Sequence, residues 1–171
     1  MAVYAMKEKE VLFVTSIIVS DLHGRETLFR RLLARQSHVD YVFFLGDGYA
    51  DAERIASEDT DALFVGVRGN CDAFLCAALE DMTLDLDGVR IFLHHGHTSG
   101  VKYGLGGACA EALRHEADVC LFGHTHLPYL SYEHREGYKP FYLFNPGSMA
   151  SGQYGVMEIR SGAVLLSHGT L

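Results

Sequence analysis

The sequence contains few basic residues. Its 171 residues include 14 Lys and Arg against 22 Asp and Glu, which gives a net charge of −8 with histidine neutral. Proteins that hold nucleic acid through a broad surface depend on a high density of Lys and Arg, so stable nucleic-acid binding is not expected. If the substrate of this chain is an anion, the positive charge that binds it has to come from something other than side chains. The composition therefore favours bound metal.

The sequence also lacks an apolar run long enough to cross a membrane. The longest run, Val11 to Val19, contains Thr15 and Ser16 and is far shorter than the about 20 residues that a membrane-spanning helix needs. Asp21 follows almost at once, and no small-residue cleavage site precedes it. We therefore interpret this run as a buried strand and expect no contact with a membrane and no signal peptide.

Cysteines are few, and their spacing is not that of a disulfide framework. The four of them show no C-x-x-C pair, and a chain of this length can bury a core without disulfides. We expect reduced thiols and a cytoplasmic protein. Repeats, low-complexity segments and Pro/Gly/Ser-rich linkers are also missing, which favours one domain spanning residues 1–171. Residues 1–10 are interpreted as a short leader.

The apolar pattern alternates strands and helices in the first half of the chain and is rich in strands in the second half. Runs such as YVFFLG and ALFVGV are apolar on both faces, which is typical of strands covered on both sides. Amphipathic spacing predicts helices over Glu26–Ser37, Ala50–Ser57 and Leu105–His115. The predicted strands are Val11–Ser20, Tyr41–Leu45, Ala62–Val67, Thr83–Leu86, Val89–His94, Val119–Phe122, Tyr129–Glu133, Phe141–Phe144, Tyr154–Ile159 and Ala163–Ser167. Two packed sheets with helices outside fit this α/β pattern, and one open sheet flanked by helices is the alternative.

Five apolar runs end directly in short polar segments that are rich in metal-binding side chains. These segments read DLHG, GDG, GNCD, HHGH and GHTH, and they contain six of the ten histidines. In α/β proteins, ligands bind beyond the carboxyl ends of the strands, where loops from neighbouring strands converge. We therefore predict that the five segments meet in one site.

The individual segments differ in how specific they are. Asp21 and His23 lie on the same face of an extended backbone and can reach one ion, although an Asp that caps the next helix is also common. Asp47 in GDG can equally be a turn residue. The sharpest signals are His95-Gly96 and the pair His124 and His126. A His-x-His pair after a buried strand is more often a ligand pair than a structural one.

The GNCD and HHGH segments complete the candidate set. Asn70 is an uncommon ligand or a turn residue, and its neutral carbonyl suits a cation without adding negative charge. His95 is a candidate ligand, whereas His94 points to the opposite face of the strand and is left out. The predicted metal ligands are Asp21, His23, Asp47, Asn70, His95, His124 and His126.

Seven ligands are too many for one tetrahedral zinc ion, which takes about four. They suit two divalent ions that share a bridging carboxylate, and a mixed nitrogen and oxygen set favours transition metals over Ca²⁺ or Mg²⁺. We expect manganese first, with iron, zinc, nickel or cobalt as alternatives. Two ions about 3.5–4 Å apart stabilise the attacking and leaving oxygens of a phosphoryl transfer, and they supply the positive field that the chain itself lacks.

In this order the motifs D-x-H, G-D, G-N-x-[DE], H-G-H and G-H-T-H resemble those of the calcineurin-like metallophosphoesterases. The chain length, the GNCD form and the NPGS segment from Asn145 to Ser148 are similar to those of the small YfcE-type phosphodiesterases. The resemblance implies a four-layer αββα sandwich of two mixed β-sheets flanked by helices, with a dinuclear metal site on loops at the sheet ends. It also implies in-line attack on phosphorus by a hydroxide that bridges the two ions.

The resemblance also divides the ligands between the two ions. It implies that the first ion is held by Asp21, His23 and His126 and the second by Asn70, His95 and His124. Asp47 would bridge the two ions and so take part in catalysis.

One residue departs from the pattern of the family. Many relatives carry a histidine after the motif Asn, and this chain has Cys71, whose thiol, with a reference pKa of about 8.5, is a poor acid for the leaving group. His97 is therefore the catalytic candidate, as a general acid or a phosphate contact, with a supporting or surface role as the alternative. Arg68 is a candidate phosphate contact or an exposed residue before a turn. Asp72 and Thr125 are candidates for orienting the ligand loops.

The leading hypothesis is a metal-dependent phosphodiesterase acting on a small phosphate ester. A phosphomonoesterase or a dinucleoside polyphosphate hydrolase with the same site is the alternative within enzymes. A non-catalytic interaction scaffold, like the retromer subunit of this fold, is the alternative of another class, and such a protein should show eroded ligands. The segment from Asn145 to Ser148 either closes one wall of the site or is a turn, and the ten Phe and nine Tyr leave a homo-oligomer open.

Overall fold

The computed structural model describes residues 13–36, 38–72 and 77–171. Within these residues, a strand or helix is present at every position where the sequence predicts one, and the ends differ by a few residues. The elements in chain order are β1 (Phe13–Val19), α1 (Glu26–Arg35), β2 (Tyr41–Phe44), α2 (Tyr49–Asp59), β3 (Leu63–Gly66), β4 (Asp81–Leu86), β5 (Val89–His94), α3 (Gly106–Arg114), β6 (Val119–Leu121), β7 (Tyr129–Glu133), β8 (Phe141–Asn145), the 3₁₀ turn η1 (Met149–Ser151), β9 (Gln153–Arg160) and β10 (Ala163–Thr170). The predicted leader lies outside the described residues.

The strands form two mixed sheets of five strands each. The first has the order β10-β9-β1-β2-β3, in which β1, β2 and β3 run parallel and β9 pairs antiparallel with both of its neighbours. The second has the order β4-β5-β6-β8-β7, in which β5, β6 and β8 run parallel and the two outer strands are antiparallel. The parallel strands therefore lie at one side of the first sheet and in the middle of the second, and antiparallel strands take the other positions.

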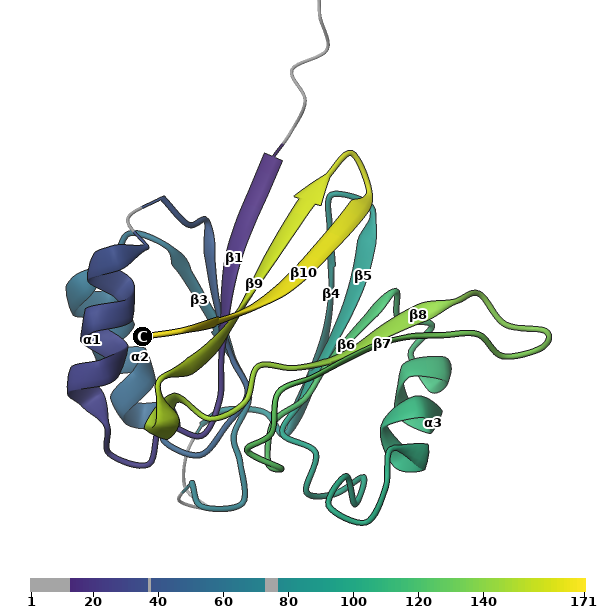
Figure 1. Cartoon of the computed structure of the whole chain (residues 1–171), viewed down its shortest axis with the longest axis horizontal. Helices are drawn as coiled ribbons and strands as arrows, with labels where there is room; N and C mark the ends of the chain where they lie inside the picture. Colours follow the sequence, from purple (N-terminus) through teal and green to yellow (C-terminus); the bar gives the residue numbers. More distant parts are fainter. Residues whose placement is uncertain (1–12, 37, 73–76) are drawn as a thin grey trace, which may run out of the picture.

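The two sheets pack face to face, and helices cover their outer faces (Figure 1). The core between the sheets is made by side chains such as Ile18, Phe43 and Leu93, all fully buried. Helices α1 and α2 pack on the first sheet over one shared apolar cluster, and α3 packs on the second sheet over another. This is the expected αββα sandwich, and the alternative of one open sheet is wrong.

Differences from the predicted element ends have local causes. Helix α2 begins at Tyr49, one residue early, because Gly48 takes a left-handed backbone with φ 116° and Asp72 accepts the N–H of Tyr49. Strands β9 and β10 are longer than predicted because their pairing continues to Gln153 and Thr170. No apolar signal marked η1, which is a single turn stabilised by local backbone bonds. Among the described helices, none has the length and apolar character needed to cross a bilayer.

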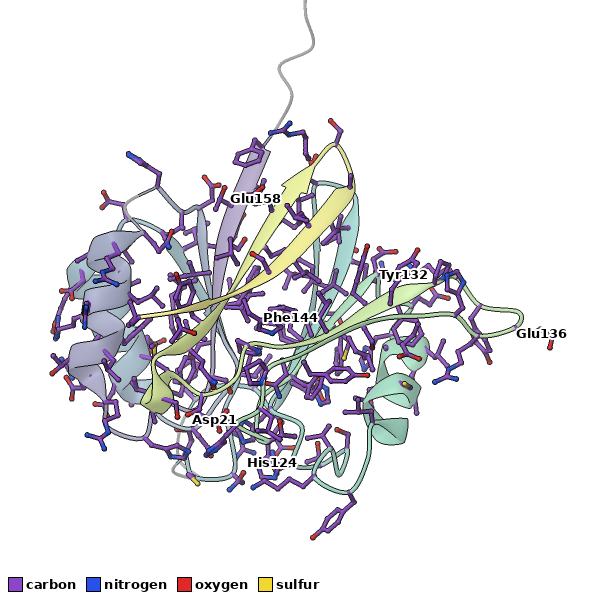
Figure 2. The ribbon with its side chains drawn as sticks, viewed as in Figure 1. Asp21, His124, Tyr132, Glu136, Phe144 and Glu158 are labelled. Atoms are coloured by element: carbon purple, nitrogen blue, oxygen red, sulfur yellow. The ribbon has the colours of Figure 1, made fainter. Side chains whose placement is uncertain are left out.

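The topology brings the carboxyl ends of the parallel strands to one edge of the sandwich. Asp21 and His124, which follow β1 and β6, lie together below the strands in Figure 2 although 103 residues separate them. Backbone bonds connect the loops: the N–H of Asp21 donates to Gly46 O at 2.9 Å, and the N–H of Gly123 donates to His95 O at 3.0 Å. The five polar segments therefore meet in one place, as predicted.

Candidate metal centre

Each predicted ligand follows the carboxyl end of a parallel strand. Asp21 and His23 follow β1, Asp47 follows β2, Asn70 follows β3, His95 follows β5, and His124 and His126 follow β6. Asp21, Asp47 and His95 are buried, and the other four predicted ligands are partly or largely exposed. A site with a buried floor and an open mouth gives solvent and substrate access to the donor atoms.

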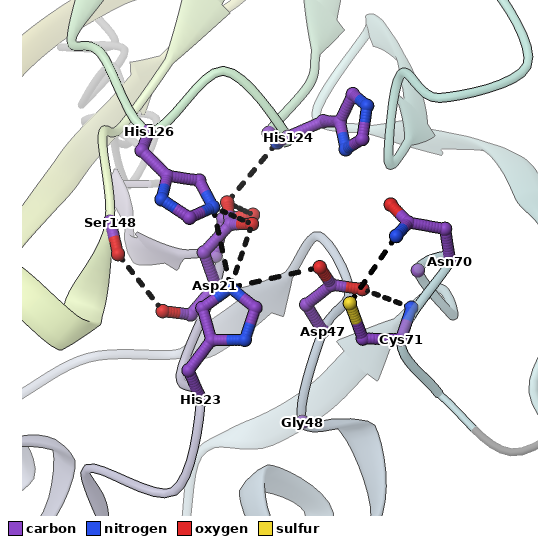
Figure 3. Close-up of polar contacts among 12 residues, drawn as sticks. Asp21, His23, Asp47, Gly48, Asn70, Cys71, His124, His126 and Ser148 are labelled. Carbon is purple, nitrogen blue, oxygen red and sulfur yellow. Dashed lines mark hydrogen bonds and ion pairs between the residues drawn. The ribbon is translucent and has the colours of Figure 1, made fainter.

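The first group of donors consists of Asp21, His23 and His126 (Figure 3). The Oδ1 atom of Asp21 lies 3.0 Å from Nε2 of His126 and 3.7 Å from Nε2 of His23. The two imidazole Nε2 atoms are 3.3 Å apart. One carboxylate oxygen and two ring nitrogens thus converge on one point.

The second group consists of His95, Asn70 and His124. Nε2 of His95 lies 3.1 Å from Oδ1 of Asn70 and 3.1 Å from Nδ1 of His124. The other ring nitrogen of His95 lies 2.6 Å from the carbonyl oxygen of Leu45. Because a carbonyl only accepts hydrogen bonds, Nδ1 carries the proton and Nε2 keeps a free lone pair that faces the site.

Asp47 stands between the two groups. Its Oδ2 lies 3.7 Å from Nε2 of His23 and 3.5 Å from Nε2 of His95, and its Oδ1 accepts the backbone N–H of Cys71 at 2.8 Å. Burial alone would raise the pKa of Asp47, but the nearby His95 and the bond from Cys71 outweigh burial, and the pKa is lowered. The carboxylate is therefore ionised at neutral pH and faces both groups with one oxygen.

A buried carboxylate oxygen without a hydrogen bond shows that this donor set fits a cation. Asp21 is fully buried, and its Oδ2 accepts the hydroxyl of Ser20 at 2.6 Å and the N–H of His124 at 3.1 Å. Its Oδ1 has no hydrogen-bond partner and faces the imidazoles of His23 and His126. Buried charges in proteins are paired or coordinate metals, so a cation between these three side chains would satisfy Oδ1.

The backbone of this region is strained in a way that is typical of functional sites. Eight of the described non-glycine residues have a positive φ, and five of them are predicted ligands. Such backbone is uncommon outside glycine and costs energy, so it persists where surrounding structure holds it for function. The five ligands are Asp21 (φ 56°), His23 (44°), Asp47 (63°), His124 (67°) and His126 (60°).

Glycines allow the ligand loops to approach one another closely. A Cβ atom at Gly69 would collide with the carboxylate of Asp47, and one at Gly123 would collide with the hydroxyl of Ser20. Gly46 has a φ of 98°, and a Cβ there would lie 2.8 Å from Nδ1 of His95. The glycines of the GDG, GNCD and GHTH segments therefore make room for ligand side chains.

Asp72 holds the loops that follow β2 and β3. Its Oδ2 accepts the backbone N–H groups of Asp47 at 2.9 Å and Gly69 at 2.7 Å, and its Oδ1 accepts those of Gly48 at 2.7 Å and Tyr49 at 2.8 Å. Four donors on one carboxylate fix the position of the loop that carries Asp47. This arrangement fits the predicted role of Asp72.

Three residues that sequence reasoning undervalued or missed also position the ligands. The hydroxyl of Ser20 donates to the carboxylate of Asp21. In the sequence, only its position directly before Asp21 could have indicated this role. In the segment expected to form a wall or a turn, Asn145 donates to Gly123 O at 2.8 Å and to Thr125 Oγ1 at 3.1 Å. Ser148 donates to the carbonyl oxygen of Asp21 at 3.1 Å. The segment from Asn145 to Ser148 thus connects the loops after β1 and β6, and Thr125 is one of its contacts.

His97 lies beside the second group. Its ring centroid is 5.5 Å from that of His95 and 6.1 Å from that of His124. Nδ1 of His97 is buried without a hydrogen-bond partner, and burial lowers the pKa of His97. Burial and the nearby His95 lower the pKa of His124 to about 4. Both imidazoles are thus neutral at neutral pH, which is the form that binds metals.

The remaining candidates lie at the margin of the site or away from it. Arg68 is partly buried and pairs with Glu80 at 2.7 Å. His94 is buried on the other face of β5, where its ring stacks on Phe92 at 5.1 Å, as its position in the strand predicts. A hollow of about 270 Å³ opens beside the first group and is lined by His23, Asp47, Gly48, Ala50, Asp51, Cys71 and Asp72.

Known proteins resemble this chain over most of its length. A model of the calcineurin-like phosphoesterase superfamily domain matches residues 15–169. Phosphodiesterase YfcE of Escherichia coli K12 is 30% identical over 157 residues, with 78% of each chain covered. The crystal structure of a predicted phosphoesterase from Streptococcus pneumoniae TIGR4 superposes with a TM-score of 0.74 at 26% identity, covering 93% of this chain and 90% of that one. The structure of Vacuolar Protein Sorting 29 from Cryptosporidium parvum shares the fold, with a TM-score of 0.67 at 17% identity, covering 93% of this chain and 98% of that one.

Proposed function

This chain belongs to the calcineurin-like phosphoesterase superfamily, and we propose that it is a metal-dependent phosphodiesterase acting on a small phosphate ester. The observation that carries the proposal is the position of Asp47 between two groups of nitrogen and oxygen donors. A single shared carboxylate between two donor groups suits two ions better than one.

In this proposal Asp21, His23 and His126 hold one divalent ion, Asn70, His95 and His124 hold the other, and Asp47 contacts both. The donor set suits manganese, iron, zinc, nickel or cobalt, and manganese is our first choice. When bound, the ions would neutralise charge on the phosphoryl oxygens and lower the pKa of a water molecule. Asp47 is ionised and its loop is fixed by Asp72, so the site is arranged before the substrate arrives.

His97 is the proposed contact for the leaving group or for a phosphoryl oxygen. Its neutral ring carries one N–H, which donates a hydrogen bond without adding charge. Cys71 occupies the position of a histidine in many relatives, and burial raises the pKa of its thiol, so it is a poor proton donor. Ester substrates whose leaving oxygen needs little protonation should therefore react fastest.

The proposed substrate is a small or accessible ester. A net charge of −8 is unfavourable for a polyanion, and we propose no stable nucleic-acid partner. The free thiols of Cys71, Cys109 and Cys120 support a cytoplasmic location.

Two alternatives remain open to test. The same site could hydrolyse a phosphomonoester or a dinucleoside polyphosphate, because two ions held by these donors would act on the phosphoryl group, which all three kinds of substrate share. The shared fold with Vacuolar Protein Sorting 29 keeps a non-catalytic interaction scaffold as the alternative of another class. The presence of all seven predicted ligands around one site favours the enzyme.

The first experiment compares an aryl phosphodiester and a phosphomonoester with the same leaving group, using chelated protein with and without Mn²⁺. We expect metal-dependent hydrolysis that is faster on the diester and at least about 100-fold slower in Asp47→Asn. Asp85→Asn, which removes an exposed carboxylate at the far end of β4, serves as the control. Faster monoester hydrolysis would favour the first alternative. No hydrolysis, together with no metal by elemental analysis, would favour the scaffold.

A further inference from the structure

The thiol of Cys71 lies at the metal centre. The sulfur of Cys71, a ring nitrogen of His23 and a carboxylate oxygen of Asp47 all lie within 4.8 Å of one another. Cys71 is in no disulfide, and it lines the hollow that opens beside the first group. Two of these three donors, His23 and Asp47, are predicted metal ligands.

Local contacts hold Cys71 in this position. Its backbone N–H donates to Oδ1 of Asp47 at 2.8 Å, and Nδ2 of Asn70 donates to its sulfur at 3.3 Å. Figure 3 shows the sulfur beside the carboxylate of Asp47, on the same side as His23. The sulfur is therefore held by the same loop that carries a predicted ligand.

A second observation points to an ion at this position. The unpartnered Oδ1 of the fully buried Asp21 lies 3.7 Å from Nε2 of His23. His23 thus belongs both to the triad with Cys71 and to the group whose carboxylate lacks a partner. An ion held by Asp21 and His23 would satisfy the buried oxygen, and His23 is the residue that this group shares with the triad of Cys71.

We propose that Cys71 supplies a sulfur ligand to a thiophilic divalent ion, such as Zn²⁺ or Co²⁺, that is held by His23 and Asp47. This inference rests on the proposed function, because it assumes that the site holds metal. The S–H bond of Cys71 breaks as the sulfur–metal bond forms, and the proton passes to solvent. The ion thus replaces the proton on the sulfur, and no oxidant or reductant takes part.

The sulfur gives the two ion positions different preferences. The position of His95 offers nitrogen and oxygen donors, whereas the position of His23 adds a soft donor that suits zinc and cobalt better than manganese. Thiophilic ions should therefore bind most tightly at the position of His23. Mn²⁺ should gain little from the thiol.

The test is titration of the chelated full-length protein with Co²⁺, followed by near-ultraviolet absorption, where a cobalt–thiolate bond gives a charge-transfer band. Wild type should develop the band, and Cys71→Ser should not. This variant keeps the backbone N–H that binds Asp47. Cys109→Ser, which removes a thiol on α3, is the matched control and should keep the band.

A competition measurement adds a readout that is independent of absorption. Cys71→Ser should lower the affinity for Zn²⁺ by at least about tenfold, the lower end of what is lost when a residue that merely orients a ligand is removed. Its affinity for Mn²⁺ should change by no more than about twofold. Two results would contradict the proposed role of Cys71 and leave the proposed function standing. One is binding of Co²⁺ by wild type without the band, and the other is a band that persists in Cys71→Ser. Absence of any metal binding would overturn the proposed function as well.

Discussion

The carboxylate of Asp72 accepts the backbone N–H of Asp47 at 2.9 Å. The same carboxylate accepts the N–H groups of Gly48, Tyr49 and Gly69, so one side chain satisfies four donors from two loops. Asp47 in turn lies between the two donor groups. The position of the shared candidate ligand therefore depends on a residue that does not itself face the proposed ions.

Asp72→Asn should weaken metal binding although it removes no proposed ligand. The amide nitrogen of Asn cannot accept a hydrogen bond, so two of the four N–H groups lose their partner at a cost of about 1–3 kcal/mol each in unfolding free energy. Residues that orient ligands typically contribute about 10–100-fold to metal affinity, and we expect a loss in that range. Urea unfolding and Mn²⁺ titration measure the two effects.

Asp61→Asn is the control for this prediction, because Asp61 is exposed and lies at the other end of α2. It should change unfolding free energy by less than about 0.5 kcal/mol. Wild-type metal affinity in Asp72→Asn would show that the loops keep Asp47 in place without Asp72.

Gly69→Ala should greatly lower activity while the chain stays folded. The backbone of Gly69 does not have a positive φ, so its conformation suits alanine, but the added Cβ would collide with the carboxylate and the backbone nitrogen of Asp47. Displacing a site residue by about 1 Å can cost about 100-fold in rate, and we expect a loss of that size. Steady-state kinetics with saturating Mn²⁺ would measure it.

Gly106→Ala is the matched control for the glycine variant. No atom lies within 4 Å of a Cβ built at Gly106, which begins α3. This variant should keep its activity, since nothing has to move. Equal activity in both variants would mean that Asp47 does not depend on the space at Gly69.

Stability should fall in acid, and His94 should contribute to this fall. Burial lowers the pKa of His94 to about 3, well below its ordinary value. Between about pH 6.5 and pH 3 the unfolded chain binds a proton here and the folded chain does not, so stability drops as the pH falls through that window. One such proton contributes a slope of about 1.4 kcal/mol per pH unit.

Urea unfolding of chelated protein at a series of pH values tests this contribution. His94→Gln should reduce the slope of unfolding free energy against pH by about one proton, whatever its effect on absolute stability. His134→Gln, which removes an exposed imidazole, is the control for the loss of a histidine as such. The same slope in His94→Gln as in wild type would assign the acid sensitivity to other groups.

Much of the fold followed from patterns that local physics imposes. Strands covered on both faces are apolar throughout, so runs such as Tyr41–Leu45 predicted the buried strands of the two sheets. Parallel strands place their carboxyl ends at one edge, so polar residues after five strands predicted one site. The resemblance to a family supplied the four layers and the division of the ligands, which periodicity alone left open.

The interactions that the sequence did not reveal are contacts between distant loops. The bond from Ser148 to the carbonyl of Asp21 spans 127 residues, and nothing in either segment marks its partner. The left-handed backbone of Asp21 and Asp47 is likewise set by the surrounding loops, since aspartate adopts it more often than most residues but is usually found in other conformations. Such contacts decide how ligands are oriented, and they become visible only in three dimensions.

Asp21→Asn should separate stability from metal binding. In the metal-free protein the buried Asp21 Oδ1 lacks a hydrogen bond, and an amide at this position could instead donate to the imidazole of His126. We therefore expect the chelated variant to unfold at the same temperature as wild type or higher. A neutral amide is a weaker ligand than a carboxylate, so the variant should also lose most of its affinity for divalent ions.

Thermal unfolding with and without Mn²⁺ tests both parts of this expectation. Mn²⁺ at about 100 times its dissociation constant stabilises a protein by about 2.7 kcal/mol, which corresponds to roughly 5–10 °C for a chain of this length. Wild type and Asp85→Asn should show this shift, and Asp21→Asn should not. A full shift in Asp21→Asn would remove Asp21 from the ligand set. A large loss of stability in the chelated variant would mean instead that the negative charge of Asp21, which faces the imidazoles of His23 and His126, stabilises the metal-free fold.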